Sequence, residues 1–114
     1  MNKVALGTLC HIQSGGTPRR GESELYGGSI PWAKIGDLNV DSGVVTNTEE
    51  TITEKGLKKI GGRVVPQGTL LFAMYGASIG KMAFSGIDLA LNQAILGIQP
   101  INPKSLDLKY VYYL

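Results

Sequence analysis

The stretch of sequence that most constrains the fold runs over residues 68–93. It contains the longest apolar segment of the chain, residues 70–75, which is bounded by proline and glycine. Such a short apolar segment between turn-forming residues is typical of a strand buried on both faces, because a buried helix needs a longer run. Residues 79–84 predict a second strand, and the small residues of the loop 76–80 join the two. We therefore expect this pair of strands to form the middle of the core.

The rest of the chain predicts short strands, turns and helices packed around that pair. Strands are expected at residues 11–13, 29–35 and 94–99, a hairpin at 40–48, a turn at 89–93, and helices at 23–26, 51–61 and 106–114. Pro31 restricts its strand to a sheet edge or a bulge. Ser23 and Thr53 are the expected N-caps, and Gly61 is placed to end its helix in a left-handed turn. Together these patterns predict one domain with an α+β, mixed α/β fold: a strand-rich twisted-sheet core with a few short helices.

Composition limits the classes of protein to which the chain can belong. The 16 glycines follow no fixed period, which favours a turn-rich globular domain over a collagen-like one. Cys10 and His11 are the single cysteine and histidine, so we expect no disulfide framework and no metal site. No apolar run approaches the roughly 20 residues of a membrane-spanning helix. A reduced, cytoplasmic setting fits these features best.

The charged residues are segregated along the chain, although the formal net charge is only +2. Residues 37–54 carry five acids and no base, whereas residues 55–87 carry five bases and no acid. A local basic surface favours contact with an anion such as nucleic acid, but a solvated helix face fits the charge pattern equally well. Lys58 and Lys59 also have a structural explanation, because cations are favoured in the last turn of a helix.

Catalytic motifs are missing from the sequence. The segment Gly-Ala-Ser-Ile-Gly-Lys at residues 76–81 has three residues between its glycines instead of the four of a phosphate-binding loop. Met82 then stands where serine or threonine would bind magnesium. His11 has no nucleophile and acid placed to act with it. The sequence therefore favours a recognition module that needs no cofactor.

Six short motifs, taken in order, resemble a target recognition domain of the specificity subunit of type I restriction-modification systems. They are Gly-Gly-Thr-Pro at 15–18, Gly-Ser-Ile-Pro-Trp at 28–32 with Gly-Asp-Leu at 36–38, Ile-Thr-Glu-Lys-Gly-Leu at 52–57, Gly-Thr-Leu-Leu at 68–71, Gly-Ala-Ser-Ile-Gly at 76–80, and Leu-Asn-Gln at 91–93. The resemblance covers nearly the whole chain, from about residue 4 to residue 114. Each motif alone is weak, and their shared order and spacing carry the likeness.

The resemblance implies a fold related to the DNA-reading domain of adenine methyltransferases and a non-catalytic role. Each such domain binds one half of a split target in double-stranded DNA, and long helices separate the two domains of a subunit. The partners implied are methyltransferase (M) and restriction (R) subunits. The chain departs from the family pattern in carrying one recognition domain, 1–114, whose residues 105–114 are expected to lead into an absent or truncated spacer helix. Self-association through such helices is left open.

The same resemblance guides the choice of DNA-contacting residues. Motifs shared by proteins that read different sequences belong to the scaffold, as we expect for residues 16–18, 68–70 and 92–93. Side chains between the motifs are the better candidates: Arg19, Arg20, Lys34, Lys58, Lys59, Arg63, Tyr75, Ser78 and Lys81. The lysines suit phosphate contact, and the arginines suit guanine edges in the major groove.

Two other interpretations stay open at this point. The loop 76–81, with Ser78 and Lys81, could instead bind a small molecule or a nucleotide, because its glycines permit close approach. Trp32 is expected to be a core anchor, with stacking on a base as the second interpretation.

Overall fold

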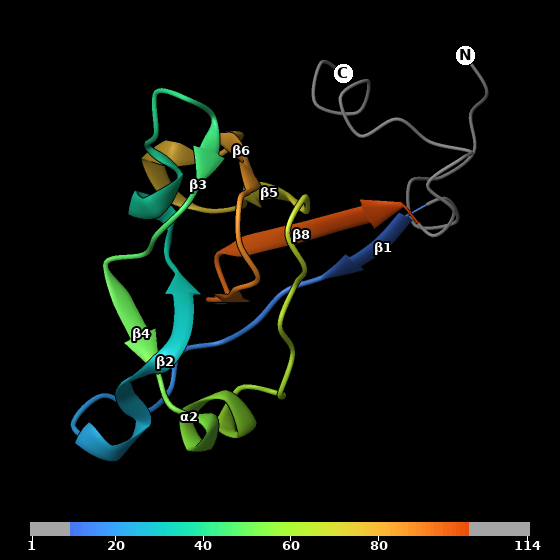
Figure 1. The fold of residues 1–114 in the computed structure, drawn as a ribbon. Coiled ribbons are helices and arrows are strands. Elements are labelled where there is room, and N and C mark those ends of the chain that lie inside the picture. Colours follow the sequence, from blue (N-terminus) through green and yellow to red (C-terminus); the bar gives the residue numbers. More distant parts are fainter. Residues whose placement is uncertain (1–9, 101–114) are drawn as a thin grey trace, which may run out of the picture.

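The computed structural model describes residues 10–100, whose strands form two sheets (Figure 1). The five-stranded sheet has the order β1 (Cys10–Gln13), β8 (Ile95–Pro100), β5 (Leu70–Ala73), β6 (Met82–Ser85) and β3 (Val44–Val45). The three-stranded sheet has the order β4 (Glu50–Ile52), β2 (Tyr26–Ala33) and β7 (Ala90–Leu91). The described helices are α2 (Glu54–Lys59) and three 3-10 helices, η1 (Ser23–Leu25), η2 (Ile35–Leu38) and η3 (Gly76–Ser78). Among the described residues, no helix is long and apolar enough to cross a membrane.

Strand β5 is the central strand of the larger sheet, as its apolar sequence predicts. Leu70, Leu71 and Ala73 are each at most 1% exposed. β5 pairs antiparallel with β6 on one side and with β8 on the other. The predicted second strand begins at Met82 rather than at residue 79, because residues 76–81 turn through η3 and through Gly80, which has a φ of 87°.

Trp32 is the anchor of the smaller sheet. It is 1% exposed and packs in one cluster with Ile52, Leu57 and Ala90. The cluster therefore joins β2, β4, β7 and α2. This burial confirms the core role expected for Trp32 and removes its ring from contact with a base.

Helix α2 is capped at both ends by the residues that its sequence predicts. The Thr53 hydroxyl accepts a hydrogen bond from the Gly56 amide at 3.1 Å, which caps the first turn. At the other end the Gly62 and Gly61 amides donate to the carbonyls of Leu57 (2.8 Å) and Lys58 (3.4 Å), and Gly61 has a φ of 101°. This is a Schellman ending, which requires the left-handed conformation that glycine adopts at low cost.

Several local predictions are wrong, mostly because a segment pairs with a strand that is distant in sequence, and one, the bulge in β2, is confirmed. The segment 40–48 is not a hairpin, because β3 pairs in parallel with β6. Residues 89–93 contain β7, which pairs in parallel with β2, so β2 is a central strand rather than an edge strand. The predicted bulge in β2 is present as a register shift between Tyr26 and Ile30. The expected helix over 51–61 is shorter, because Glu50–Ile52 pairs with β2, and Glu22 rather than Ser23 precedes η1 as its cap.

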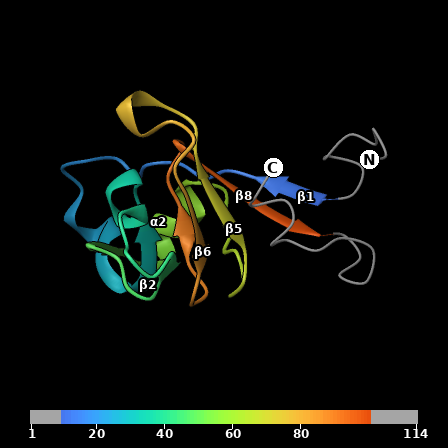
Figure 2. The same ribbon diagram turned by 90° about the horizontal axis from the view of Figure 1, so that it is seen from above.

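Strands β1 and β8 bring the two ends of the described chain together. Cys10 lies opposite Pro100 in an antiparallel ladder that continues to Gln13 opposite Gly97. Figure 2 shows this pair extending to one side, away from β2 and α2. The predicted helix over 106–114 lies outside the described residues.

Candidate nucleic-acid interface

Residues 15–17, which precede the two candidate arginines, are hydrogen-bonded to β7 and to the residues that follow it. The Gly16 amide donates to the Leu91 carbonyl at 3.1 Å. A Cβ atom added to Gly15 would lie 1.8 Å from the Leu91 carbonyl oxygen, so only glycine fits this approach. The Thr17 hydroxyl donates to the Gln93 side-chain oxygen at 2.6 Å. These motif residues therefore make internal contacts, in agreement with a scaffold role.

The next part of this segment is fastened to the aromatic side chains of β2. The Trp32 indole N–H donates to the Gly16 carbonyl at 3.0 Å, and the Tyr26 hydroxyl donates to the Pro18 carbonyl. The two rings meet edge to face, with centroids 5.9 Å apart. The backbone on the N-terminal side of Arg19 is thus held at successive points.

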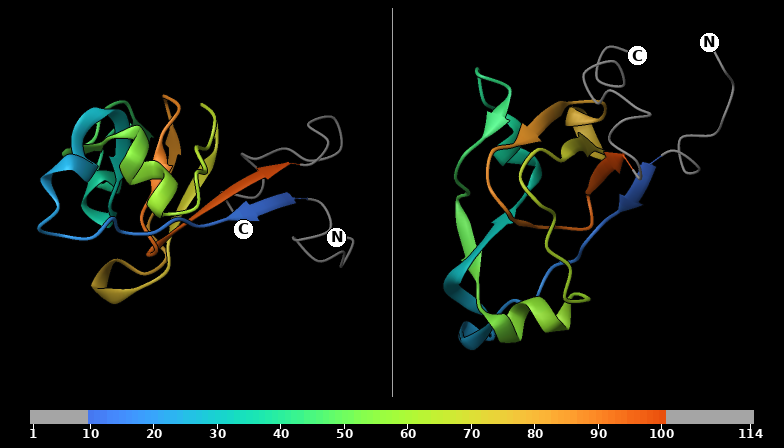
Figure 3. Two further views of the ribbon diagram at one scale, coloured as in Figure 1. Left: turned by 90° about the horizontal axis from the view of Figure 1, so that it is seen from below. Right: turned by 45° about the vertical axis from the view of Figure 1, so that its right-hand side comes forward.

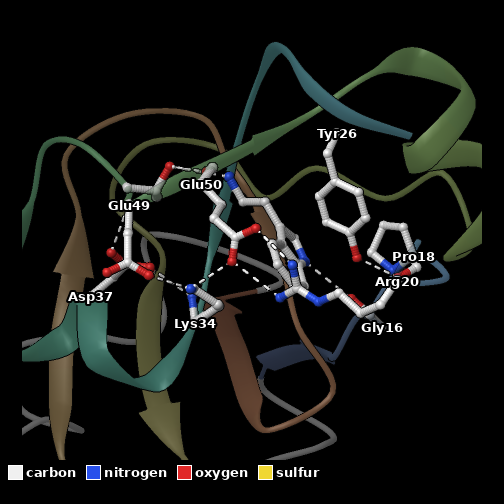
Figure 4. Close-up of polar contacts among 10 residues, drawn as sticks. Gly16, Pro18, Arg20, Tyr26, Lys34, Asp37, Glu49 and Glu50 are labelled. Carbon is white, nitrogen blue, oxygen red and sulfur yellow. Dashed lines mark hydrogen bonds and ion pairs between the residues drawn. The ribbon is translucent and has the colours of Figure 1, made fainter. Parts of the chain in front are cut away.

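Arg20 is bound on the outer side of these rings (Figure 4). Its two terminal nitrogens donate to the two carboxylate oxygens of Glu50, at 2.8 and 3.1 Å. The guanidinium carbon lies 4.8 Å from the Tyr26 ring centroid and 5.3 Å from that of Trp32. Bidentate pairing and stacking are the interactions in which arginine differs most from lysine.

Lys34 approaches the same carboxylate from the other side. Its ammonium group donates to Glu50 at 2.7 Å and also to Glu49 (Figure 4). The hydrogen bonds from Arg20 and then Lys34 lower the pKa of Glu50 from 4.5 to about 2. The main chain adds to the arrangement, because the Asp37 carboxylate accepts from the amides of Lys34 (2.8 Å) and Glu49 (2.9 Å). Two of the predicted DNA-contacting residues are thus engaged with carboxylates of the chain itself.

A second group of candidate residues surrounds the C-terminal end of α2. Lys58, Lys59 and Arg63 are exposed, and no ion pair is formed by them within residues 10–100. The side chain of Arg19 is 83% exposed and lies 3.9 Å from a Glu22 oxygen. Arg19 and Lys59 both line a surface hollow of about 330 Å³, together with Thr17, Pro18, Glu22 and Leu25. This end of the domain can offer several positive charges to an anion.

The third group lies on the loop between β5 and β6. Tyr75 is 59% exposed, Lys81 is exposed and Ser78 is half-buried. Figures 1 and 3 place this loop and α2 at opposite ends of the molecule. The nine candidates therefore do not form one cluster.

The loop 76–81 gives no support to a nucleotide site. The amides of Ile79, Gly80 and Lys81 donate to carbonyls within the same hairpin, at 2.9–3.2 Å. A phosphate-binding loop would need such amides free to point at the ligand.

Glu50 is the residue that sequence reasoning missed. It lies 30 positions from Arg20, and its contacts follow from the β2–β4 ladder, in which it stands opposite Trp32. The sequence places this segment at the approach to a helix, where it would have no cross-strand neighbours. If Glu50–Ile52 were recognised as a strand, cross-strand neighbours would be expected for Glu50, and these contacts could be predicted.

Comparison with known proteins gives a consistent result. The family described as "Type I restriction modification DNA specificity domain" matches residues 1–114. The type I restriction enzyme MjaIX specificity subunit of Methanocaldococcus jannaschii is 36% identical over 105 residues, which are 90% of this chain and 23% of that protein.

Solved structures share the fold. The HsdS subunit from Thermoanaerobacter tengcongensis superposes with a TM-score of 0.72 at 20% identity, over 97% of this chain and 27% of that one. A chain from a structural study of complex assembly and conformational transition in a type I R-M system superposes with a TM-score of 0.71 at 19% identity, over 96% of this chain and 26% of that one. The present chain spans about a quarter of the length of these proteins. The resemblance and the strand-rich mixed fold expected from the sequence are confirmed: the chain belongs to the family of type I restriction-modification DNA specificity domains.

Proposed function

We propose that this chain is a non-catalytic, sequence-specific DNA-binding domain that reads one half of a bipartite target for a type I restriction-modification complex. The observation that carries this proposal is the family match over residues 1–114. The fold, which is similar to that of HsdS, agrees with the family match. The chain acts as one target recognition domain, and the reactions on DNA belong to other subunits.

The proposed partners are double-stranded DNA, methyltransferase subunits and restriction subunits. The relative from M. jannaschii is named as the specificity subunit of a type I restriction enzyme, and the word subunit implies an enzyme of more than one component. The similar chain from the study of complex assembly in a type I R-M system supports the same partners. We place the complex in the cytoplasm, where the buried thiol of Cys10 can remain reduced.

We assign the proposed DNA contacts by the charges that remain available. Lys58 and Lys59 suit phosphate contact, because an ammonium is a point charge that positions DNA without specifying bases. Arg19 and Arg63 suit base edges, because a guanidinium can pair with guanine. Residues Tyr75, Ser78 and Lys81 form a separate candidate contact on the β5–β6 loop. Arg20 and Lys34 would contribute through the ion pairs that they already make.

The test uses the full-length natural subunit assembled with its methyltransferase partner. Genomic adenines methylated by the wild-type complex are mapped beside those methylated by the Arg63→Ala complex. We expect a split motif in the wild type, and relaxation of one position in one half of it in the variant. Arg63→Lys is the matched control for charge, since it retains the cation and loses the bidentate fork.

The outcomes separate the class of function from the choice of residue. A well-folded complex that methylates without any sequence preference would contradict the proposed function. A split motif that is identical in the wild type and in Arg63→Ala would retain the function and remove Arg63 from the reading surface.

A further inference from the structure

We propose that the two adjacent arginines have different tasks: Arg19 reads a guanine of the target, and Arg20 is a positioning residue that holds Arg19 in place. This inference rests on the proposed function and names the residues that set its specificity. Sequence alone treats the pair as equivalent, since both follow the same Gly-Gly-Thr-Pro motif.

Arg20 is already bound in the way that an arginine would bind guanine. Both arms of its fork donate to Glu50, at 2.8 and 3.1 Å, so the two parallel donors needed for the O6 and N7 atoms of guanine are occupied. Its flat face is covered as well, because the guanidinium lies over Tyr26 and beside Trp32. Release of Arg20 toward DNA would break these contacts and leave Glu50, whose side chain is 28% exposed, with Lys34 alone.

Arg19 has the opposite environment. Its side chain is 83% exposed, and the nearest carboxylate oxygen, on Glu22, lies 3.9 Å from one terminal nitrogen. That separation exceeds hydrogen-bond length, so the fork of Arg19 keeps its donors free. The side chain borders the hollow that Lys59 also lines, where a phosphate contact by the lysine would bring duplex DNA beside Arg19.

The backbone around Arg19 is fixed on both sides. Before it, the Pro18 carbonyl accepts from the Tyr26 hydroxyl, and Pro18 is fully buried. After it, Arg20 is tied to Glu50 on β4, 30 residues away in sequence. A reading side chain needs such a support, because a small displacement of the fork removes one of its two hydrogen bonds. The bidentate pair of Arg20 and Glu50, here called the clasp, supports Arg19 on its C-terminal side.

The experiment maps methylated adenines for the assembled full-length complex with four variants: Arg19→Ala, Arg20→Ala, Glu50→Gln, and Arg19→Ala combined with Glu50→Gln. Arg19→Ala is expected to relax one G·C position in one half-site, with loss of roughly a 10- to 100-fold preference for guanine. Arg20→Ala and Glu50→Gln are expected to relax the same position partially. The double variant is expected to be no more relaxed than Arg19→Ala, because both changes act on one contact.

Further measurements separate positioning from a general loss of structure. Arg20→Lys keeps the charge but loses the fork and the stacking, so it should restore the preference for guanine only in part. Thr53→Ala, which weakens the cap of α2 without touching the clasp, should lower stability and leave the motif unchanged. A relaxed position that differs between Arg19→Ala and Arg20→Ala would overturn the proposal, and so would an Arg20→Ala complex with the wild-type motif. Absence of any motif in the wild type would instead overturn the proposed function.

Discussion

At the scale of single residues, Glu50 connects the polar groups on the outer surface of the smaller sheet. It accepts hydrogen bonds from Arg20 and Lys34, while the Thr48 hydroxyl donates to its backbone carbonyl at 2.7 Å. Its charge balances two cations that stand 14 positions apart in sequence. Removal of the carboxylate would leave the two cations close together without the anion between them. Removal of one cation would leave the carboxylate paired with the other.

The pKa of Glu50 predicts a specific dependence of stability on pH. The value is about 2 in the folded chain and 4.5 for an unperturbed carboxyl, so between these values the unfolded state binds more protons. The contribution of Glu50 is therefore complete above about pH 4.5 and is lost as the pH falls through this window toward 2. Urea unfolding of the chain, followed by the fluorescence of Trp32, should show this dependence in the wild type and a weaker one in Glu50→Gln. An equal dependence of the free energy of unfolding on pH in the two proteins would contradict the lowered pKa of Glu50.

Gly15 provides a second test at the same scale. A methyl group at this position would meet the Leu91 carbonyl oxygen at 1.8 Å, so Gly15→Ala must displace the backbone of residues 14–16 from β7. We expect a decrease of about 1–3 kcal/mol in the free energy of unfolding, as for other overpacked sites. The control is Gly36→Ala, where an added Cβ meets nothing within 4 Å. Comparable decreases in the two variants, measured by urea unfolding, would contradict the close approach.

At the scale of elements, the ends of α2 illustrate what the sequence can predict. Thr53 and Gly61 each act within a few residues of the helix end that they form, and their expected roles are confirmed. Strands β5 and β8 are also predictable, because their apolar runs are bounded by turn residues. Local signals of this kind need no knowledge of the rest of the fold.

The pairings that sequence reasoning missed have the opposite character. β3 is parallel to β6, and β7 is parallel to β2, although each of the two shorter strands contains only two residues. Such short strands carry no periodic pattern, and a parallel partner lies far away in sequence. The same reason explains why the site was only partly predicted: the arginines and lysines are identified by type, but the carboxylates that engage Arg20 and Lys34 come from β4 and the loop before it.

The cap of α2 yields a prediction for this element. Thr53→Ala removes the acceptor for the Gly56 amide and the donor to the Glu24 carbonyl at 2.8 Å. We expect a decrease in stability of about 1 kcal/mol, seen as faster hydrogen exchange of the amides in the first turn. Thr53→Ser keeps the hydroxyl and should retain most of the protection. If serine and alanine behave alike, the hydroxyl is not the stabilising group.

At the scale of the whole molecule, the positive charge that residues 10–100 leave available is divided between two ends. One group surrounds the end of α2 and consists of Arg19, Lys58, Lys59 and Arg63. At the other end, Lys81 lies on the β5–β6 loop. Lys55 is on the same helix as Lys58 and Lys59, but its ammonium group pairs with Glu24 at 2.7 Å. The number of lysines therefore overstates the charge that the helix can offer to DNA.

This difference predicts how DNA binding responds to salt. In the assembled complex, neutralisation of Lys58 and Lys59 to glutamine should weaken binding and reduce the slope of log affinity against log salt by about 1 for each phosphate that is no longer neutralised. Lys55→Gln removes the same kind of charge from the same helix and should change the slope much less, because that lysine is already paired. Equal changes per lysine for the two substitutions, in titrations at several salt concentrations, would show that overall charge decides binding rather than this surface.

The antiparallel ladder of β1 and β8 has a further consequence for a polypeptide that contains this domain. Since Cys10 lies opposite Pro100, the described part of the chain begins and ends at neighbouring points. A domain whose two ends lie side by side can be replaced by another domain of the same fold, while the rest of the polypeptide keeps its geometry. For the function proposed above, a new target half would then arise by exchange of one compact domain.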